Sequence, residues 1–359
     1  MKHAKITRRK ILGTAALVPL PLSGTMVASA NAHSPKTAGR PSAVVPFGAY
    51  NGSVDGVRTP FDGEIHNNSL AVSPHERIAV ATNSQSDHLV VIDLRRGQKI
   101  TQIKGYVTPR NILFAPDGQS FTVSDSTLGV LDRISLRTFQ VEKRLPLGAG
   151  VFGTAQTKDG KRLYANNQAA NTVTVVDLAA SRPVTVITGF AQPRQGVKLA
   201  PAEDMLYVTN FQGDRISTVD TATNKPVKEI GGFNQVRGLS ISRDGTRLYA
   251  ANSGDNTVSI VDTASGATLH RTPVGQQPYG AALAPDETIL FSGNLGGNTL
   301  TAVDPGPGSV IGTVTGLIGP RQAISFSADS KTAWVLNEDL TIAEVDVPAL
   351  KVIRTLGRN

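Results

Sequence analysis

Short runs of alternating apolar and polar residues, separated by turn-forming residues, fill most of the chain after residue 65. One group of four such runs covers residues 237–242, 248–251, 257–261 and 267–270. Turn residues such as Arg243-Asp244-Gly245 separate the runs, and Val, Ile, Leu, Ala and Thr fill them. Alternation with a period of two predicts half-buried strands, and no stretch shows a sustained helical period. The pattern therefore predicts an all-β protein.

The group of four runs recurs along the chain. Its clearest marker is an apolar run that ends in a polar residue, usually Asp, at positions 93, 135, 177, 220, 262, 304 and 346. The steps of 42 or 43 residues define seven repeats. Four short strands in a repeat of about 40 residues is the pattern of a propeller blade. We therefore predict a seven-bladed β-propeller, with four antiparallel strands per blade, over residues 63–359.

Two of the repeats carry a family resemblance. Residues 206–210 (Leu-Tyr-Val-Thr-Asn) and 248–252 (Leu-Tyr-Ala-Ala-Asn) resemble the repeat of the YVTN β-propeller family, and the chain is most similar to its exported YncE-like members. The resemblance covers residues 65–357 and implies a fold rather than an activity. Repeat two departs from the pattern with Ser124-Asp125, and repeat seven departs with Leu336-Asn337-Glu338 and a shortened loop.

The N-terminal segment has the features of an export signal. Residues 1–32 contain Arg8-Arg9, five basic and no acidic side chains, a mildly apolar stretch and small residues near Ala30. This pattern resembles a twin-arginine signal peptide, so we expect a periplasmic or extracellular protein. Residues 33–62 are expected to form a leader and to contain a candidate closing strand. No stretch is apolar enough to span a bilayer stably, so we expect no stable membrane insertion.

Composition excludes several classes of site. The chain has no Cys, which rules out disulfides, Cys-ligated metals and a thiol nucleophile. The formal charge is +8, but residues 1–32 hold 5 of the 36 basic side chains, and the remaining 31 against 28 acidic residues leave only +3. Global charge therefore says little about partners. Neither a phosphate-binding loop nor a dinucleotide fingerprint is present.

A ring of seven positions is the candidate ligand site. In propellers the first strand of each blade is innermost, so the residues that start these strands should converge at one mouth of the central channel. Counted at the repeat period, they are Asn68, Arg110, Phe152, Arg194, Arg237, Tyr279 and Arg321. Four like charges around one mouth repel one another, which a bound anion would relieve. Arginines interleaved with aromatic rings suit single-stranded nucleic acid, an anionic small molecule or an acidic peptide.

A structural interpretation of the same ring stands beside the functional one. Five acidic residues fall in the loops between the second and third strands, at the same face: Asp87, Asp125, Asp214, Asp255 and Asp339. They could pair with the arginines and leave a neutral network. A ladder of Asn or Asp at the end of each second strand is expected to bond the adjoining turns: Asn83, Asp125, Asn167, Asn210, Asn252 and Asn294.

These observations favour an exported, non-catalytic binding scaffold that is monomeric and needs no cofactor, with an anionic ligand or protein partner at the channel mouth and nucleic acid among the candidates. The alternative is a hydrolase similar to the propeller lactonases, which implies a central calcium held by carboxylates and amides with a His nearby. The candidate groups in this chain are Glu64, His66, Asn68, Asn167, Asn210 and Asn294. Arg at four of seven ring positions disfavours a cation there. A propeller quinoprotein implies repeated Trp motifs, whereas Trp334 is the single Trp and suits blade packing.

Overall fold

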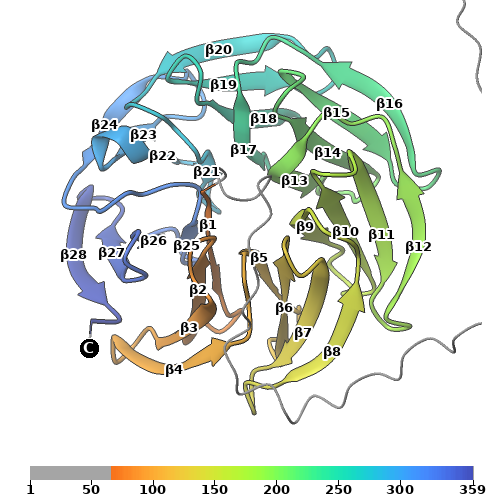
Figure 1. Ribbon diagram of the computed structural model, residues 1–359. Coiled ribbons are helices and arrows are strands. Elements are labelled where there is room, and N and C mark those ends of the chain that lie inside the picture. Colours follow the sequence, from red (N-terminus) through yellow and green to blue (C-terminus); the bar gives the residue numbers. More distant parts are fainter. Residues whose placement is uncertain (1–65, 359) are drawn as a thin grey trace, which may run out of the picture. The chain divides into compact units, whose positions relative to one another are not determined.

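The computed structural model describes residues 66–358 of the chain. The predicted signal peptide (1–32) and leader (33–62) therefore lie outside the described residues. Within them, seven four-stranded sheets are arranged in a ring, and each sheet is built from four consecutive antiparallel strands (Figure 1). This confirms the predicted seven-bladed all-β propeller.

The innermost strand of each blade faces the centre of the ring in Figure 1. These strands are β1 (Asn68–Val72), β5 (Pro109–Phe114), β9 (Val151–Gln156), β13 (Pro193–Leu199), β17 (Val236–Ile241), β21 (Ala282–Leu283) and β25 (Ile324–Phe326). The second strands are β2 (Ile78–Asn83), β6 (Ser120–Asp125), β10 (Arg162–Asn167), β14 (Met205–Asn210), β18 (Arg247–Asn252), β22 (Leu290–Asn294) and β26 (Thr332–Leu336).

The third and fourth strands complete each blade toward the rim. The third strands are β3 (His88–Asp93), β7 (Val130–Ser135), β11 (Thr172–Asp177), β15 (Arg215–Asp220), β19 (Thr257–Asp262), β23 (Thr299–Val303) and β27 (Ile342–Asp346). The fourth strands are β4 (Gln98–Lys104), β8 (Val141–Pro146), β12 (Arg182–Ile187), β16 (Lys225–Ile230), β20 (Thr268–Pro273), β24 (Val310–Val314) and β28 (Lys351–Leu356). A short 3-10 helix, η2 (Leu295–Gly297), joins β22 to β23.

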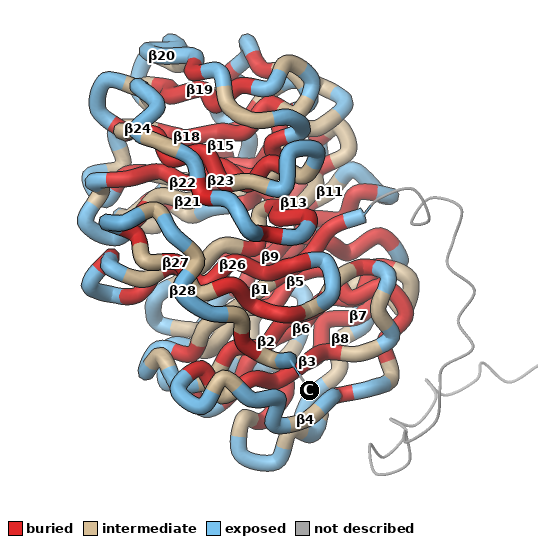
Figure 2. The backbone as a smooth tube through the Cα atoms, turned by 90° about the vertical axis from the view of Figure 1, so that its left-hand side faces the viewer, coloured by how far each residue is buried: buried red, intermediate tan, exposed pale blue. Residues whose placement is uncertain are grey.

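The second strands pack on both faces, because neighbouring blades cover each side of the sheet. On β18, Leu248 and Ala250 belong to the apolar core on one side of the blade, whereas Tyr249 and Ala251 belong to the core on the other side. All four are 3% exposed or less. The fourth strands lie at the rim and are largely exposed, as β20 shows (Figure 2). One blade alone would leave an apolar face in water, so stacking in a ring stabilises every blade.

The ring closes between blades seven and one by packing and hydrogen bonds. Trp334 is 6% exposed and packs with Ala79, Ala81 and Leu356 in the core that joins these two blades. Asn83 donates from Nδ2 to the carbonyl of Glu338 across the same junction, at 3.0 Å. Within residues 66–358 each blade consists of consecutive strands, so closure there involves no exchanged strand. The expected packing role of Trp334 is confirmed.

Asn167 of the Asn ladder makes the predicted bonds to its own turn, because its Oδ1 accepts the backbone N–H groups of Ala169 and Ala170 at 3.1 and 2.9 Å, whereas Asn252 bonds the next strand and a preceding loop. Asn252 is fully buried, and its Nδ2 donates to Thr257 Oγ1 and Ser259 Oγ at 3.1 and 2.8 Å. Its Oδ1 accepts the backbone N–H of Asn234 at 3.4 Å. The predicted turn at Gly245 also forms, with a φ of 75°. Among the described residues there is no helix of the length and apolarity that a membrane crossing requires.

Candidate site at the channel mouth

Four of the seven predicted ring residues line one small cavity at the channel mouth. Phe152, Arg194, Arg237 and Tyr279 border a space of about 20 Å³, together with His66, Asn67, Gln195, Gly238 and Gln322. The other three ring residues are part of the packed framework. Asn68, Arg110 and Arg321 are only 1%, 0% and 6% exposed. The cavity is large enough for about one water-sized group.

The arginines and aromatic rings alternate in a continuous stack. The Arg194 guanidinium carbon lies 3.5 Å from the ring centre of Phe211, and that of Arg237 lies 4.7 Å from the same ring. Arg237 is also 4.0 Å from the ring centre of Tyr279, which Arg321 approaches at 5.1 Å. Each ring therefore presents its face to two cations. Cation–π attraction of this kind partly offsets the repulsion between the guanidinium groups.

Neutral groups supply most of the hydrogen bonds to these arginines. Arg237 Nε donates to Ser253 Oγ at 2.7 Å, and Arg194 Nη2 donates to the side-chain oxygen of Gln192 at 2.9 Å. Arg194 Nε is buried and has no hydrogen-bond partner. In residues 66–358 no carboxylate lies within 4.0 Å of the Arg194 or Arg237 guanidinium. Two partly exposed positive charges therefore lie at the mouth without a described acidic partner.

Arg110 and Arg321 are held more firmly by the protein. Arg110 donates to Ser126 Oγ at 2.8 Å and to Asn67 Oδ1 at 2.7 Å, and it lies 4.6 Å from the ring centre of Phe152. Arg321 donates to the carbonyl of His66 at 3.1 Å and approaches a Glu338 carboxylate oxygen at 3.4 Å. These two arginines have built-in partners, so the candidate cations for a ligand are Arg194 and Arg237.

The partly buried environment of Arg194 and Arg237 disfavours their charged forms. Burial, and then the neighbouring Arg237 guanidinium, lower the pKa of Arg194 to about 9. Burial also lowers the pKa of Arg237, and the charge of Arg321 acts in the same direction, whereas Tyr279 opposes it. Arg194 remains protonated at neutral pH. An anion close to both guanidinium groups would offset the cost of these charges.

The five loop aspartates do not neutralise these two arginines. Three of them form bonds within their own loops or with nearby strands: Asp87 with His88 at 2.7 Å, Asp255 with Arg271 at 2.9 Å, and Asp339 with Thr341 at 3.0 Å. Asp214 accepts the backbone N–H of Gln235 at 2.6 Å. Asp125 accepts backbone N–H groups from Val107, Thr108, Thr127 and Leu128. The structural interpretation therefore holds for Arg321, whose acidic partner is Glu338. The sequence pattern did not predict Glu338 as a partner of a ring arginine.

Phe211 is the ring-forming residue that sequence reasoning missed. It follows Asn210 of the ladder and so begins the loop between β14 and β15. The residue that follows the ladder position contacts the ring arginine of the same blade elsewhere too, as Ser126 and Ser253 show. A second count at the repeat period, one residue beyond the ladder, would have identified Phe211.

A network of side-chain amides forms the floor of the mouth. The Gln195 side-chain oxygen accepts from Asn67 Nδ2 at 3.0 Å and from Gln322 Nε2 at 2.6 Å. Gln195 Nε2 donates to Asn111 Oδ1 at 3.3 Å. Gln195 and Gln322 border both the mouth cavity and a larger cavity below it. The network therefore separates the central channel into an upper mouth and a lower chamber.

His66 lines the mouth and is exposed. Its backbone carbonyl bonds Arg321, and no described hydrogen bond involves its ring. Glu64, one of the candidate groups for the lactonase-like alternative, lies outside the described residues. Residues 66–358 contain no group of three or more His, Asp or Glu side chains placed to hold a metal ion.

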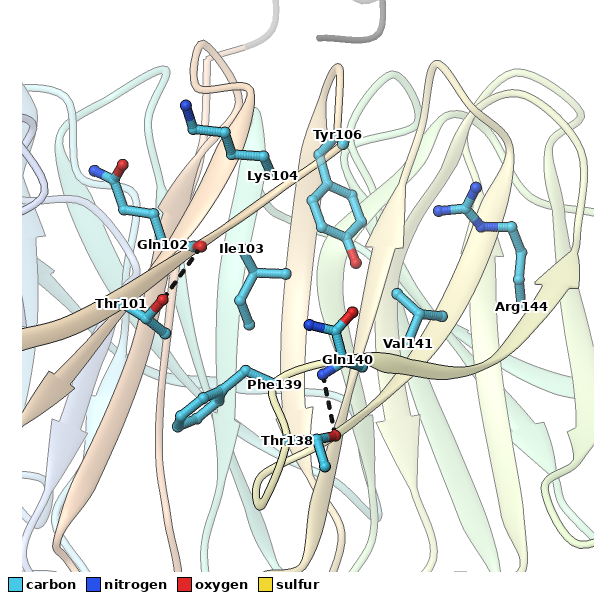
Figure 3. A pocket seen from close by; sticks show the side chains of 11 residues that line it. Thr101, Gln102, Ile103, Lys104, Tyr106, Thr138, Phe139, Gln140, Val141 and Arg144 are labelled. Atoms are coloured by element: carbon cyan, nitrogen blue, oxygen red, sulfur yellow. Dashed lines mark hydrogen bonds between the residues drawn. The ribbon is translucent and has the colours of Figure 1, made fainter. Parts of the chain in front are cut away.

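A cavity of about 300 Å³ lies at the rim, between β4 and β8 (Figure 3). Its lining includes Lys104, Tyr106, Phe139 and Arg144. Arg144 makes a bidentate ion pair with the fully buried Asp132, at 2.8 and 2.7 Å, and Tyr106 donates to the same carboxylate at 3.1 Å. Because this arginine is committed to Asp132, the rim cavity is a weaker candidate for an anion than the channel mouth.

Comparisons with known proteins agree with the architecture. Residues 226–349 match the family model of the YNCE-like beta-propeller. Among solved structures, the Kuenenia stuttgartiensis hydrazine synthase is similar, with a TM-score of 0.71 and 19% identity over 82% of this chain and 99% of that chain. At this identity the likeness shows the fold alone, and 1773 solved chains match. A comparison with curated proteins gave no match.

The matched segment runs from the last strand of blade four to the third strand of blade seven. The remaining blades have the same four-stranded design and complete a ring of seven. The family match over residues 226–349 and the seven-bladed ring both agree with the resemblance to YncE-like β-propellers that the repeats predicted.

Proposed function

We propose that this protein is a non-catalytic binding propeller whose channel mouth takes an anionic group between Arg194 and Arg237. The observation that carries the proposal is the pair of partly exposed guanidinium groups with no described carboxylate partner. Their lowered pKa values have the same origin, because burial and like charge both oppose the charged forms. A ligand carboxylate or phosphate would supply the missing counter-charge.

The mouth favours a small anionic group over stacked nucleotide bases. Phe211 and Tyr279 already pack their faces against two guanidinium groups each. Phe152 is 1% exposed and packs against Arg110. The rings therefore offer little free face to a base, whereas nucleic-acid binding by stacking needs one. The cavity of about 20 Å³ admits one terminal group. We therefore propose an anionic small molecule or an acidic peptide terminus as the ligand, met after twin-arginine export.

The proposal is tested by titrating the protein with three probes: citrate, a hexaglutamate peptide and an oligothymidylate. We expect citrate or hexaglutamate to bind more tightly than oligothymidylate, with an affinity that falls as NaCl increases. Loss of two charged contacts in the Arg194→Gln/Arg237→Gln variant should weaken binding by at least about tenfold, since a contact of this kind is worth ~2 kcal/mol or more.

A matched control separates the site from net charge. Lys99→Gln/Lys225→Gln removes the same two charges from exposed positions on the outer strands β4 and β16. This variant should bind each probe as the wild type does. An equal loss of probe affinity in both double variants, or unchanged affinity in the arginine variant, would overturn the proposed mouth site. Tightest binding of oligothymidylate would overturn the choice of ligand.

A further inference from the structure

The lower chamber of the channel is a second cavity, distinct from the mouth. It has a volume of about 330 Å³ and is lined by all seven inner strands or the residues that lead into them. Its ceiling is the amide network of Asn111, Gln195 and Gln322 described above. Apolar side chains such as Leu113, Leu283 and Phe326 border it as well. This size is typical of small-molecule sites.

Lys198 on β13 is the one charged residue among the described residues that line this chamber. Lys198 pairs with Tyr207 of β14, and the residues that pair with the equivalent position of the other second strands are all uncharged: Ala71, Leu113, Ala155, Ser240, Ala282 and Ser325. No described hydrogen bond or ion pair involves the Lys198 ammonium group, so a positive charge lies in the chamber without a partner in residues 66–358.

Water reaches Lys198, yet the blades surround it. The residue is exposed to solvent within the channel. Desolvation among the surrounding strands nevertheless lowers the pKa of Lys198, and no neighbouring charge contributes to that shift. Arg243 and Glu287 border the adjoining lower cavity that shares Lys198, and they bond each other through the Arg243 backbone N–H and the Glu287 carboxylate. No described ion pair joins the Glu287 carboxylate to the Lys198 ammonium group.

Hydroxyl groups add polar character to the chamber wall. Ser69 Oγ accepts the N–H of Ile112 at 3.0 Å, and Thr154 Oγ1 accepts from Asn111 Nδ2 at 2.7 Å. Oxygens with two lone pairs can accept a further bond, and a hydroxyl can donate one. The chamber thus combines a single cation, polar ceiling groups and an apolar wall. That set matches a ligand with one negative charge and at least one further hydrogen-bonding group.

We propose that the lower chamber is a second binding site, for a small monocarboxylate that carries a hydroxyl or keto group. Its carboxylate pairs with Lys198, and its second polar group reaches the amide and hydroxyl groups above. This site goes beyond the proposed function, because it uses none of the arginines of the mouth. The amide network keeps the two ligands apart.

Lactate and its uncharged isostere lactamide are the probes for this site. Calorimetric titration of the wild-type protein should show lactate binding at least about tenfold more tightly than lactamide, because only lactate offers a partner to the ammonium. Lys198→Met should remove that difference, and Lys198→Arg should restore part of it. Arg194→Gln/Arg237→Gln should leave lactate binding unchanged.

Two outcomes would overturn the chamber site. The first is equal binding of lactate and lactamide, or no binding of either, by the wild type. The second is lactate binding that survives Lys198→Met but is lost in the arginine variant, which would place lactate at the mouth and leave the proposed function intact. A measurement on the wild type alone serves if the variants fold poorly. Lactate, and not lactamide, should slow the acylation of Lys198 by an amine-reactive ester, as read by mass spectrometry, and equal rates would refute the proposal.

Discussion

Replacing Arg194 by methionine should stabilise the free protein. The Arg194 guanidinium is largely buried, its Nε has no partner, and burial lowers its pKa from the usual value of an arginine to about 9. Below pH 9 the folded state therefore bears the cost of a charge that the unfolded chain holds freely in water. Methionine has a similar length, no charge and a sulfur that packs well against the Phe211 ring.

The size of the effect follows from the competing terms. The lowered pKa of Arg194 corresponds to a free-energy cost of about 5 kcal/mol for the charged side chain in the folded state at full burial. Partial exposure of Arg194 to water reduces this cost to about 2–3 kcal/mol. The substitution also removes the cation–π contact with Phe211 and the hydrogen bond to Gln192, together worth about 1 kcal/mol once the new sulfur–ring contact is counted. The net expectation is a gain of about 1–2 kcal/mol in the free energy of unfolding.

Urea denaturation at low salt is the assay, because guanidinium chloride would supply both competing cations and anions. The gain in the free energy of unfolding should narrow as pH rises above 9, since the wild-type folded state then loses the Arg194 proton while the unfolded chain keeps it to a much higher pH. Arg321→Met is the matched control, because that guanidinium has Glu338 and the His66 carbonyl as partners, and its loss should destabilise the protein. If Arg194→Met destabilises as much as Arg321→Met, the reasoning is refuted.

Three other predictions concern the framework. Trp334→Ala should lower the free energy of unfolding by about 3–5 kcal/mol, with a smaller loss for Trp334→Phe, because the residue fills the core that closes the ring; an effect below about 1 kcal/mol in urea denaturation would contradict this. The Asp125 carboxyl should titrate above 3.8 in carbon-13 NMR, because burial outweighs the N–H groups that it accepts. Its stabilising contribution is therefore largest below pH 3.8 and is lost as pH rises through the folded-state pKa, and a midpoint below 3.8 would contradict the assignment. Gln195→Leu should destabilise by about 2–3 kcal/mol, since Asn67 and Gln322 lose a shared acceptor, and unchanged thermal unfolding would show that the amide floor is not structural.

The blade count and strand order could be predicted because each depends on periodicity alone. Alternation with a period of two identifies strands, and a period of 42 or 43 residues identifies blades, as the bounds of β17 to β20 show for the fifth blade. The burial of Trp334 follows from the same pattern, because it occupies an apolar position in a second strand.

The chemistry of the ring was less predictable, because equal spacing does not give equal surroundings. Arg110 and Arg194 occupy equivalent positions, yet Arg110 is fully buried against Asn67 and Phe152, whereas Arg194 borders the mouth. These contacts cross between blades and depend on residues that break the repeat. Phe211 follows the ladder residue Asn210, and Gln195 follows the ring residue Arg194, so neither occupies a position that the repeat count singled out. Only the three-dimensional arrangement shows that they form the wall and the floor of the site.

Anomalous diffraction from crystals soaked in bromide tests the central claim most directly. Bromide is a small anion that needs only an uncompensated positive site of about the size found here. An anomalous peak in contact with the Arg194 and Arg237 guanidinium groups is the predicted result. A mouth without bromide, with a carboxylate of the protein itself seated between the two arginines, would contradict the account.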